Sequence, residues 1–160
     1  MTARLKALVW VVRPAKAGPE VLLLERPQQR GGGHHPVTGK ADGDESPAAC
    51  AAREAEEETG LRGALHDLER RHTFRDQRRG RSMEEHAFLL VVDQGSEPKL
   101  SSEHISARWA EPADARAALE WPAHREALER ALGLFARLSA SCYEARPCRS
   151  SPSPPRSPKG

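Results

Sequence analysis

The segment Gly39–Leu61, GKADGDESPAACAAREAEEETGL, constrains the fold of this chain more than any other part of it. Ser46 and Pro47 supply an N-cap and a first-turn proline, and Gly60 stands where a helix end adopts the left-handed conformation. These signals predict one helix over Pro47–Thr59. The helix ends in a run of glutamates. Negative charges repel each other there and are disfavoured by the helix dipole, so the run indicates a functional role rather than a contribution to stability.

The acidic residues of this helix are spaced to share one face. Glu54, Glu57 and Glu58 stand at i, i+3 and i+4, whereas Glu56 points elsewhere. Like charges at this spacing cost roughly 0.2–0.5 kcal/mol per pair, and the C-terminal helix dipole adds a similar penalty. A hard divalent cation held by oxygen ligands reverses that repulsion, and Mg²⁺ is commonly held by few carboxylates plus waters and phosphate oxygens. The pattern therefore indicates a magnesium site and a phosphorylated substrate; the alternative is a solvated acidic face.

Strand and helix patterns lie on both sides of this segment, and a stripe of small residues on the helix is expected to pack against a sheet. The stripe consists of Ala48, Ala51, Ala52, Ala55 and Thr59. The expected strands are Leu5–Val12, Glu20–Arg26, the short Val37–Lys40, Ala64–Asp76, Glu84–Asp93 and His104–Ala110. The expected loops are Pro27–Pro36 and Gln77–Ser82, and two further helices are expected over Ala113–Leu119 and Ala123–Leu138. This order predicts one mixed α/β domain over residues 1–140, followed by a disordered Ser/Pro/Arg-rich tail over 141–160.

Composition excludes several classes of protein. The formal net charge is +2, with 25 basic against 23 acidic residues, so no global field argues for nucleic acid or membrane binding. No apolar run approaches the roughly 18 residues of a membrane helix, and the N-terminal segment lacks a secretory cleavage site, which predicts a cytoplasmic protein. The cysteines Cys50, Cys142 and Cys148 have no CxxC spacing, which disfavours a disulfide framework and a zinc site.

The helix and its flanking loop resemble a known signature. The matching positions are Gly39, Glu45, Arg53, Glu54, Glu57, Glu58, Gly60 and Leu61, which together reproduce the signature of the Nudix hydrolases. The resemblance implies an α/β/α sandwich with a mixed β-sheet between helices, and hydrolysis of a phosphoanhydride bond with Mg²⁺, for which Mn²⁺ can substitute. Ala55 departs from the pattern, because the family usually carries a larger aliphatic residue there.

The same resemblance implies roles for the signature residues. Glu54, Glu57 and Glu58 are expected to bind the metal, with the Gly39 carbonyl completing the sphere. Structural support is expected from Glu45, Arg53 and Gly60, with the Arg53 guanidinium holding a carboxylate bidentately. The catalytic base is left open between Glu57, Glu58 and a carboxylate from elsewhere.

Two carboxylates outside the signature compete for work at the metal. Glu85 is expected at the head of a strand, and we favour it as an extra ligand. Glu103 precedes another strand and is the alternative catalytic base. Cations are needed to hold the phosphates, and the candidates are Arg26, Lys40 and the mobile reserve Arg75, Arg78, Arg79 and Arg81.

Three short motifs bear on the identity of the substrate. The Val-Thr-Gly turn at 37–39, the Glu-His pair at 103–104 before Arg-Trp, and Trp-Pro at 121–122 resemble the bacterial dihydroneopterin triphosphate pyrophosphatases. That branch usually has a tryptophan before its Val-Thr-Gly, where this chain has His34, His35 and Pro36. Ring stacking then falls to Trp10, Trp109 or Trp121, each of which is otherwise a core residue.

The expected partner is a small-molecule nucleotide or pterin triphosphate, and neither a membrane nor a nucleic acid is expected. A dinucleoside polyphosphate hydrolase is the nearest alternative, because it differs in products rather than in catalytic residues. An RNA 5′-end pyrophosphohydrolase would use the basic loop Gln77–Arg81 and the Arg-rich tail to hold the strand, and would show steep salt dependence. A binding module without hydrolysis is disfavoured, because no signature glutamate is missing.

Overall fold

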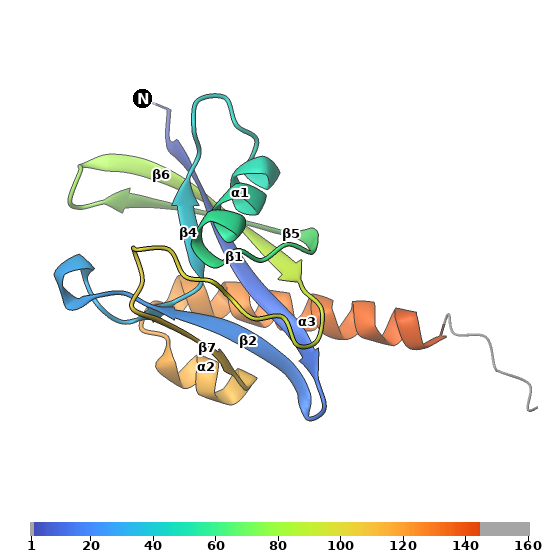
Figure 1. Cartoon of the computed structure of the whole chain (residues 1–160). Coiled ribbons are helices and arrows are strands. Elements are labelled where there is room, and N and C mark those ends of the chain that lie inside the picture. Colours follow the sequence, from blue (N-terminus) through green and yellow to red (C-terminus); the bar gives the residue numbers. More distant parts are fainter. Residues whose placement is uncertain (1, 145–160) are drawn as a thin grey trace, which may run out of the picture.

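The computed structural model describes residues 2–144 of the 160-residue chain (Figure 1). Its strands are β1 (Arg4–Ala15), β2 (Gly18–Glu25), β3 (His34–His35), β4 (Val37–Lys40), β5 (Ala64–Asp76), β6 (Arg81–Val91) and β7 (Ser106–Ala110). Its helices are the 3₁₀ turn η1 (Gln28–Arg30), α1 (Pro47–Thr59), α2 (Pro112–Ala118) and α3 (Pro122–Glu144). None of these helices combines the length and the apolarity that crossing a membrane requires.

The long strand β1 organises a mixed sheet. One edge of β1 pairs in parallel with β6, which in turn pairs with β5. The other edge is shared, because Lys6–Val9 pair with β4 while Val12–Ala15 pair with β2. Strands β3 and β7 then flank β2. Strands β2 and β4 therefore pair with different parts of the same edge of β1. The chain that connects β2 to β4 contains Arg26 and the glycine-rich segment.

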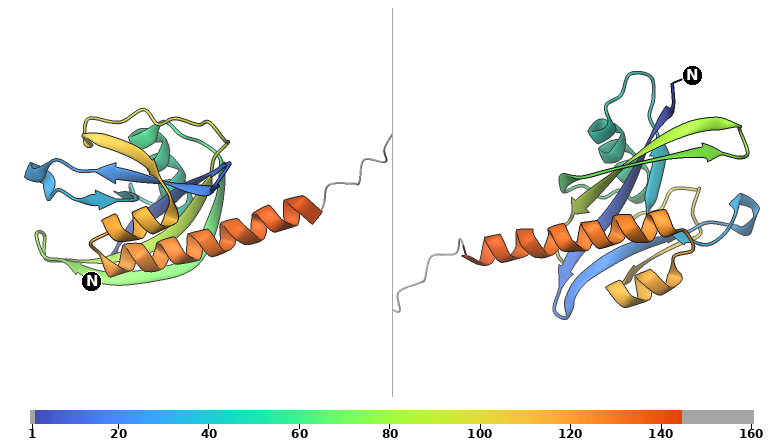
Figure 2. Two further views of the ribbon diagram at one scale, coloured as in Figure 1. Left: turned by 90° about the horizontal axis from the view of Figure 1, so that it is seen from below. Right: turned by 180° about the vertical axis from the view of Figure 1, so that it is seen from behind.

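Helices cover both faces of this sheet, with α1 on one side and α3 on the other (Figure 2). Alternation along β1 divides its side chains between two cores. Leu8 and Trp10 pack with α3, whereas Ala7 and Val9 pack with α1. The sandwich of helices around a mixed sheet that the sequence predicts is confirmed.

Helix α1 has the predicted bounds, and its ends show why. The Ser46 hydroxyl accepts a hydrogen bond from the Ala49 amide at 3.2 Å, and Gly60 ends the helix with φ 69°. The expected small-residue stripe is partly wrong, because Ala48 and Ala52 are exposed. The buried face instead consists of Cys50, Ala51, Ala55, Glu58 and Thr59.

Three other expectations need correction. The segment Pro27–Pro36 is more than a loop, because it contains η1 and β3, and the Arg26 amide donates to the Gly33 carbonyl at 3.2 Å. Strand β6 begins at Arg81, so the basic loop is shorter than expected. Helix α3 continues through residues 141–144, which were predicted to belong to the tail; the rest of that tail lies outside the described residues.

Candidate active site

Arg53 is the centre of the loop and helix that carry the signature. Its Nε and Nη2 donate to the two carboxylate oxygens of Glu45 at 2.8 and 2.9 Å, and Nη2 also donates to the Lys40 carbonyl at 3.0 Å. The Asp42 amide donates to Glu45 at 3.0 Å. The hydrogen bonds from Arg53 hold the pKa of Glu45 low, at about 2. The guanidinium therefore makes the expected bidentate contact and fastens the loop to the helix.

The same guanidinium compensates two of the crowded glutamates. Arg53 Nη1 donates to Glu54 Oε1 at 3.0 Å and to Glu57 Oε2 at 3.1 Å. The Glu57 side chain is 59% exposed, whereas that of Glu54 is 14% exposed. Glu56 points away and forms an ion pair with Arg62, as expected from the helical spacing. Solvent and Arg53 together explain how the helix tolerates this part of its charge.

Glu58 has no such compensation. It is 5% exposed, and its Oε2 has no hydrogen-bond partner. Burial and, after it, the carboxylates of Glu54 and Glu103 raise the pKa of Glu58 to about 8, against the opposing charge of Arg26. Burying a carboxylate without a hydrogen-bonded cation costs free energy of folding, so Glu58 is expected to destabilise the fold.

Glycine at position 39 lets Glu54 lie against β4. A Cβ at Gly39 would stand 1.9 Å from Glu54 Cδ, so any other residue would displace the carboxylate. The Cys50 thiol points at the Gly39 carbonyl at 3.7 Å. Burial raises the pKa of Cys50 to about 11, which agrees with a packed thiol rather than a nucleophile.

The segment between β6 and β7 brings Glu103 to the acidic turn. The Lys99 amide donates to the Thr59 carbonyl at 2.8 Å, and the Ser101 amide donates to the Glu58 carbonyl at 3.2 Å. Glu103 is close enough for its charge to raise the pKa of both Glu54 and Glu58. Its nearest cation is Arg30, at 3.9 Å.

Glu85 is placed differently from the expectation. It lies inside β6 rather than at its head, and it is only 3% exposed. Its register partner on β1 is Lys6, whose Nζ is 3.8 Å from Glu85 Oε2. Because Lys6 and Leu8 share a face of β1, this pair lies on the face covered by α3, opposite α1. Glu103, rather than Glu85, is the carboxylate that this arrangement offers to the acidic turn.

The predicted cations divide into two groups. Arg26 is half-buried, donates to Thr38 Oγ1 at 3.0 Å, and lies near Glu58 and Glu103. Lys40 is half-buried, and its pKa is lowered by burial and by the charges of Arg79 and Arg4. The remaining candidates Arg75, Arg78, Arg79 and Arg81 are exposed at the β5–β6 hairpin.

Two of the hairpin arginines reach towards the site. Arg78 Nη2 is 3.6 Å from where a Cβ on Gly31 would be, so it lies against the glycine-rich segment, and its charge lowers the pKa of Arg26. Arg79 acts on Lys40 in the same way. Within residues 2–144, no contact ties Arg75 or Arg81 to the acidic turn.

The histidines and tryptophans resolve into distinct positions. His35 is buried, its Nδ1 is 2.6 Å from the Pro36 carbonyl, and its ring lies 5.0 Å from that of His104. Burial, followed by the charge of Arg26, lowers the pKa of His35 to about 3. Trp10 is fully buried, and Trp109 packs against the Arg13 guanidinium at 4.2 Å. Of the three tryptophans only Trp121, 61% exposed, presents its ring to solvent.

Sequence reasoning missed Lys6. It stands in the apolar strand LKALVWVV, where period-two alternation would have placed it on the same face as Leu8 and Trp10. A lysine on a core-facing position is an anomaly that could have been noticed.

The donors of the acidic turn fit a hard divalent cation. They are all oxygens, and one of them, Glu58 Oε2, is buried and without a partner. In this conformation, residues 2–144 hold no three acidic, imidazole or thiol groups close enough to enclose an ion, and Arg53 engages oxygens of Glu54 and Glu57. The expected metal face is therefore assembled only in part.

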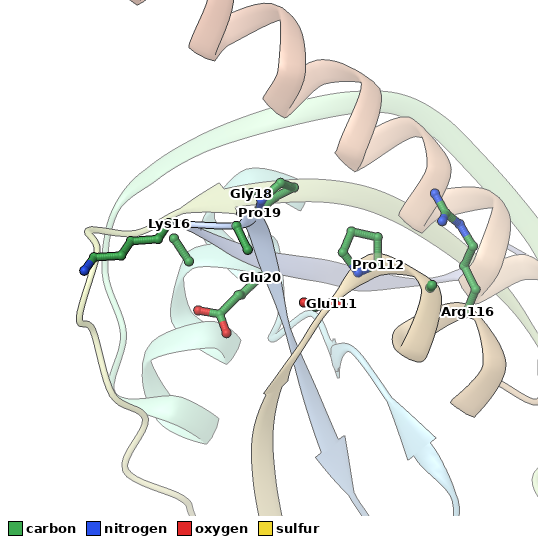
Figure 3. A pocket seen from close by; sticks show the side chains of 10 residues that line it. Lys16, Gly18, Pro19, Glu20, Glu111, Pro112 and Arg116 are labelled. Atoms are coloured by element: carbon green, nitrogen blue, oxygen red, sulfur yellow. The ribbon is translucent and has the colours of Figure 1, made fainter.

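A surface hollow of about 590 Å³ lies elsewhere, between the β1–β2 turn and the start of α2 (Figure 3). Its charged lining consists of Lys16, Glu20, Glu111 and Arg116. It lies at the opposite end of β1 from β4 and the acidic turn, so it adds nothing to this site.

Comparison with known proteins gives the following matches. The profile of the NUDIX domain matches residues 2–131. An octanoyltransferase of Myxococcus xanthus is 40% identical over 118 residues, which is 71% of this chain and 33% of that protein. The chain thus spans about a third of the length of this curated relative.

Two solved structures share the fold. The Ap4A hydrolase of C. elegans, in a binary complex, is 21% identical with a TM-score of 0.71, covering 87% of this chain and 99% of that one. The dihydroneopterin triphosphate pyrophosphohydrolase of E. coli is 21% identical with a TM-score of 0.70, covering 82% and 98%.

Proposed function

The chain belongs to the NUDIX family of hydrolases, and on that premise we propose that it is a Mg²⁺-dependent pyrophosphohydrolase of a nucleoside-triphosphate-like substrate. The candidate substrates are dihydroneopterin triphosphate and the (deoxy)nucleoside triphosphates. The observation that carries the proposal is the buried carboxylate of Glu58, which has an oxygen without a partner on the face that the signature assigns to the metal. Such a group is explained if a cation compensates it.

The residues have separate tasks in this proposal. Glu54, Glu57 and Glu58 hold the metal together with the Gly39 carbonyl, and the metal when bound neutralises the phosphate charge and makes a water more acidic. Arg53 positions Glu54 and Glu57, and through Glu45 it fixes the loop. Gly60 ends the helix at the turn.

Residues around the acidic turn would remove the proton from the attacking water and bind the phosphates. Glu103 is the proposed base, because it lies near Glu58 and outside the Arg53 contacts; Glu57 and Glu58 are the alternatives. Arg26 is placed to hold a phosphate oxygen, since it already lies between Glu58, Glu103 and Thr38. Lys40, Arg78 and Arg79 extend the positive charge for further phosphates.

The test is a substrate panel with Mg²⁺ or Mn²⁺. Purified protein is incubated with dihydroneopterin triphosphate, nucleoside triphosphates, diadenosine polyphosphates and ADP-ribose, and products are separated by chromatography. Release of pyrophosphate from a triphosphate, lost on chelation and in Glu58→Gln but retained in Glu56→Gln, is the expected result. Glu56→Gln is the matched control because Glu56 lies on the same helix and points away. No hydrolysis of any triphosphate would contradict the proposal.

A dinucleoside polyphosphate is the second candidate substrate. It is favoured by the row of cations beyond Arg26, in which Lys40 lies near both Arg79 and Arg4, and by the fold shared with an Ap4A hydrolase. A longer phosphate chain would engage more of these cations than a triphosphate does. Products that retain a nucleotide at both ends of the cleaved bond would identify this activity. Octanoyl transfer is not part of the proposal, because the chain matches 33% of that relative.

A further inference from the structure

Helix α3 crosses the face of the sheet opposite α1 (Figure 2), and the strand register puts a second polar cluster on that face. Its members are Lys6 on β1, Arg70 and His72 on β5, Glu85 on β6 and His124 in the first turn of α3. The strand register brings Lys6 and His72 to either side of Glu85. Arg70 lies two residues before His72 on β5, and its Nη2 donates to Glu126 of α3 at 2.7 Å, so it lies between the sheet and the start of α3.

Two polar atoms of this cluster, Arg70 Nη1 and His124 Nδ1, are buried without partners, and its carboxylate makes only a long ion pair. Glu85 is 3% exposed, and the 3.8 Å to Lys6 Nζ exceeds a hydrogen bond. Arg70 is 8% exposed; its Nη2 donates to Glu126 at 2.7 Å, but its Nη1 has no partner. His124 Nδ1 is also buried and without one. Buried polar groups are normally hydrogen-bonded, so two unpartnered atoms beside a long ion pair indicate a ligand with polar edges.

The cluster is accessible and has flat side chains. The Lys6 side chain is 21% exposed, and His72 and Phe74 are half-buried. The rings of His72 and Phe74 stack with centroids 5.5 Å apart and planes at 20°, and Lys6 Nζ lies 5.6 Å from the Phe74 centroid. A flat heterocycle can lie against such rings while its edge reaches Lys6 and Glu85.

The cluster also adjoins the acidic turn. The strand register sets Lys40 opposite Lys6 and Thr38 opposite Leu8, so Thr38 lies on the same face of the sheet as Lys6. Arg26 Nη2 donates to Thr38 Oγ1 at 3.0 Å, which brings Arg26 beside the cluster. A substrate with its phosphates at Arg26 and Glu58 therefore has this cluster within reach of its other end.

We propose that this cluster selects the substrate by its ring, and that it accepts the 2-amino-4-oxopyrimidine edge shared by guanine and the pterins. That edge presents, in order, an oxo oxygen, a ring N–H and an amino group. The Lys6 ammonium donates to the oxo group, and the two Glu85 oxygens accept from the ring N–H and the amino group. Adenine places an amino group opposite Lys6 and an unprotonated nitrogen opposite Glu85, so it mismatches both. This inference rests on the proposed function, whose ring specificity it names.

The test compares kcat/KM for GTP, ITP and ATP in the wild type and two neighbouring variants. Glu85→Gln replaces one acceptor oxygen by a donor, whereas Glu84→Gln changes the adjacent residue of β6, which faces the other side of the sheet. We expect the wild type to prefer GTP over ATP by about 10- to 100-fold, with ITP between them, since each hydrogen bond lost is worth roughly tenfold. Glu85→Gln should abolish most of that preference, and Glu84→Gln should keep it.

Magnesium titration separates this role from metal binding. If Glu85 reads the ring, Glu85→Gln leaves the half-saturating Mg²⁺ concentration unchanged. An equal loss for all three nucleotides, with a raised Mg²⁺ requirement, would overturn the inference and make Glu85 a metal ligand. An unchanged GTP/ATP ratio in Glu85→Gln would also overturn it.

Binding without turnover keeps the inference independent of activity. If no triphosphate is hydrolysed, the proposed function fails, and calorimetry with GMP and AMP then tests the ring site alone. Tighter binding of GMP than of AMP, lost in Glu85→Gln and in Lys6→Met, supports it; equal binding of the two nucleotides contradicts it. Thermal melting of both variants shows that they are folded.

Discussion

The acidic residues on the two faces of the sheet differ in how their charges are neutralised. On the α1 side, Glu45, Glu54 and Glu57 share one guanidinium through hydrogen bonds of 2.8 to 3.1 Å. On the α3 side, Glu85 is buried with its nearest cation 3.8 Å away. Glu58 belongs to α1 but resembles Glu85 in being buried and outside the Arg53 contacts, and one of its oxygens has no partner. Acidic residues of one chain therefore differ less in their chemistry than in their burial and in the cations that hydrogen-bond to them.

The largest expected effect comes from removing the uncompensated charge at Glu58. Glu58→Gln should lower kcat by roughly 10³-fold or more, since it removes a metal ligand of the proposed reaction. It should not lower the melting temperature of the metal-free protein, because the lost charge is buried and repelled by its neighbours. Steady-state kinetics and thermal melting check both statements. A smaller loss of kcat in Glu58→Gln than in Glu57→Gln would break the comparison, because Glu57 is exposed and held by Arg53.

Substitution of Arg53, which hydrogen-bonds Glu45, Glu54 and Glu57, should lower the stability of the fold. Arg53→Lys loses the bidentate contact with Glu45 and most of the contacts to Glu54, Glu57 and the Lys40 carbonyl. We expect a loss of about 2–3 kcal/mol in the free energy of unfolding, measured by urea denaturation, because several charge-assisted hydrogen bonds disappear together. Unchanged stability in Arg53→Lys would show that the cluster is less tightly coupled than its geometry indicates.

Two buried histidines, His35 on the α1 side and His124 on the α3 side, make the stability depend on acid. Burial lowers the pKa of His35 to about 3 and that of His124 to about 4, both below the ordinary value of 6.5. The neutral rings contribute stability that is complete above pH 6.5 and is lost as pH falls towards 4 and then 3. Urea denaturation between pH 7 and pH 4.5 should show a loss of about 2 kcal/mol beyond that of a His124→Gln variant. If the free energy of unfolding fell equally with pH in the wild type and in His124→Gln, the assignment of this pH dependence to His124 would be contradicted.

The smallest effect is expected at the exposed pair of Glu56 and Arg62. Glu56→Gln should change the free energy of unfolding by less than about 0.5 kcal/mol, as is usual for surface ion pairs, and should leave kcat unchanged. Thermal melting and kinetics of this variant supply the baseline against which Glu58→Gln is compared. A large effect here would mean that charge anywhere on α1 matters, rather than its burial.

Much of the fold followed from local signals. The bounds of α1 follow from Ser46, Pro47 and Gly60, because caps and special backbone conformations are encoded by single residues. The full length of β5, Ala64–Asp76, was also predicted, although a bulge between Asp67 and Arg70 interrupts its alternation. The strand β3 within Pro27–Pro36 was missed, because it depends on pairing with β2 rather than on its own two residues.

The site was predictable in part. The bidentate contact between Arg53 and Glu45 and the outward direction of Glu56 both follow from residue type and helical spacing. The placement of Glu85 did not, because its side of the sheet depends on the register with β1 and on where β6 begins. Lys6 was overlooked because nothing in an isolated strand shows which charge will stand opposite it.

The sequence by itself determined the elements and the list of charges, since caps, turns and periodicity act over a few residues and are written in neighbouring letters. Only the tertiary structure decided which carboxylates are compensated. Glu57 and Glu58 are adjacent and chemically identical, yet one is 59% exposed and bonded to Arg53 while the other is 5% exposed with an unpartnered oxygen. The reason is that desolvation depends on what packs around a group, and the segment that carries Glu103 and covers the end of α1 lies far along the chain.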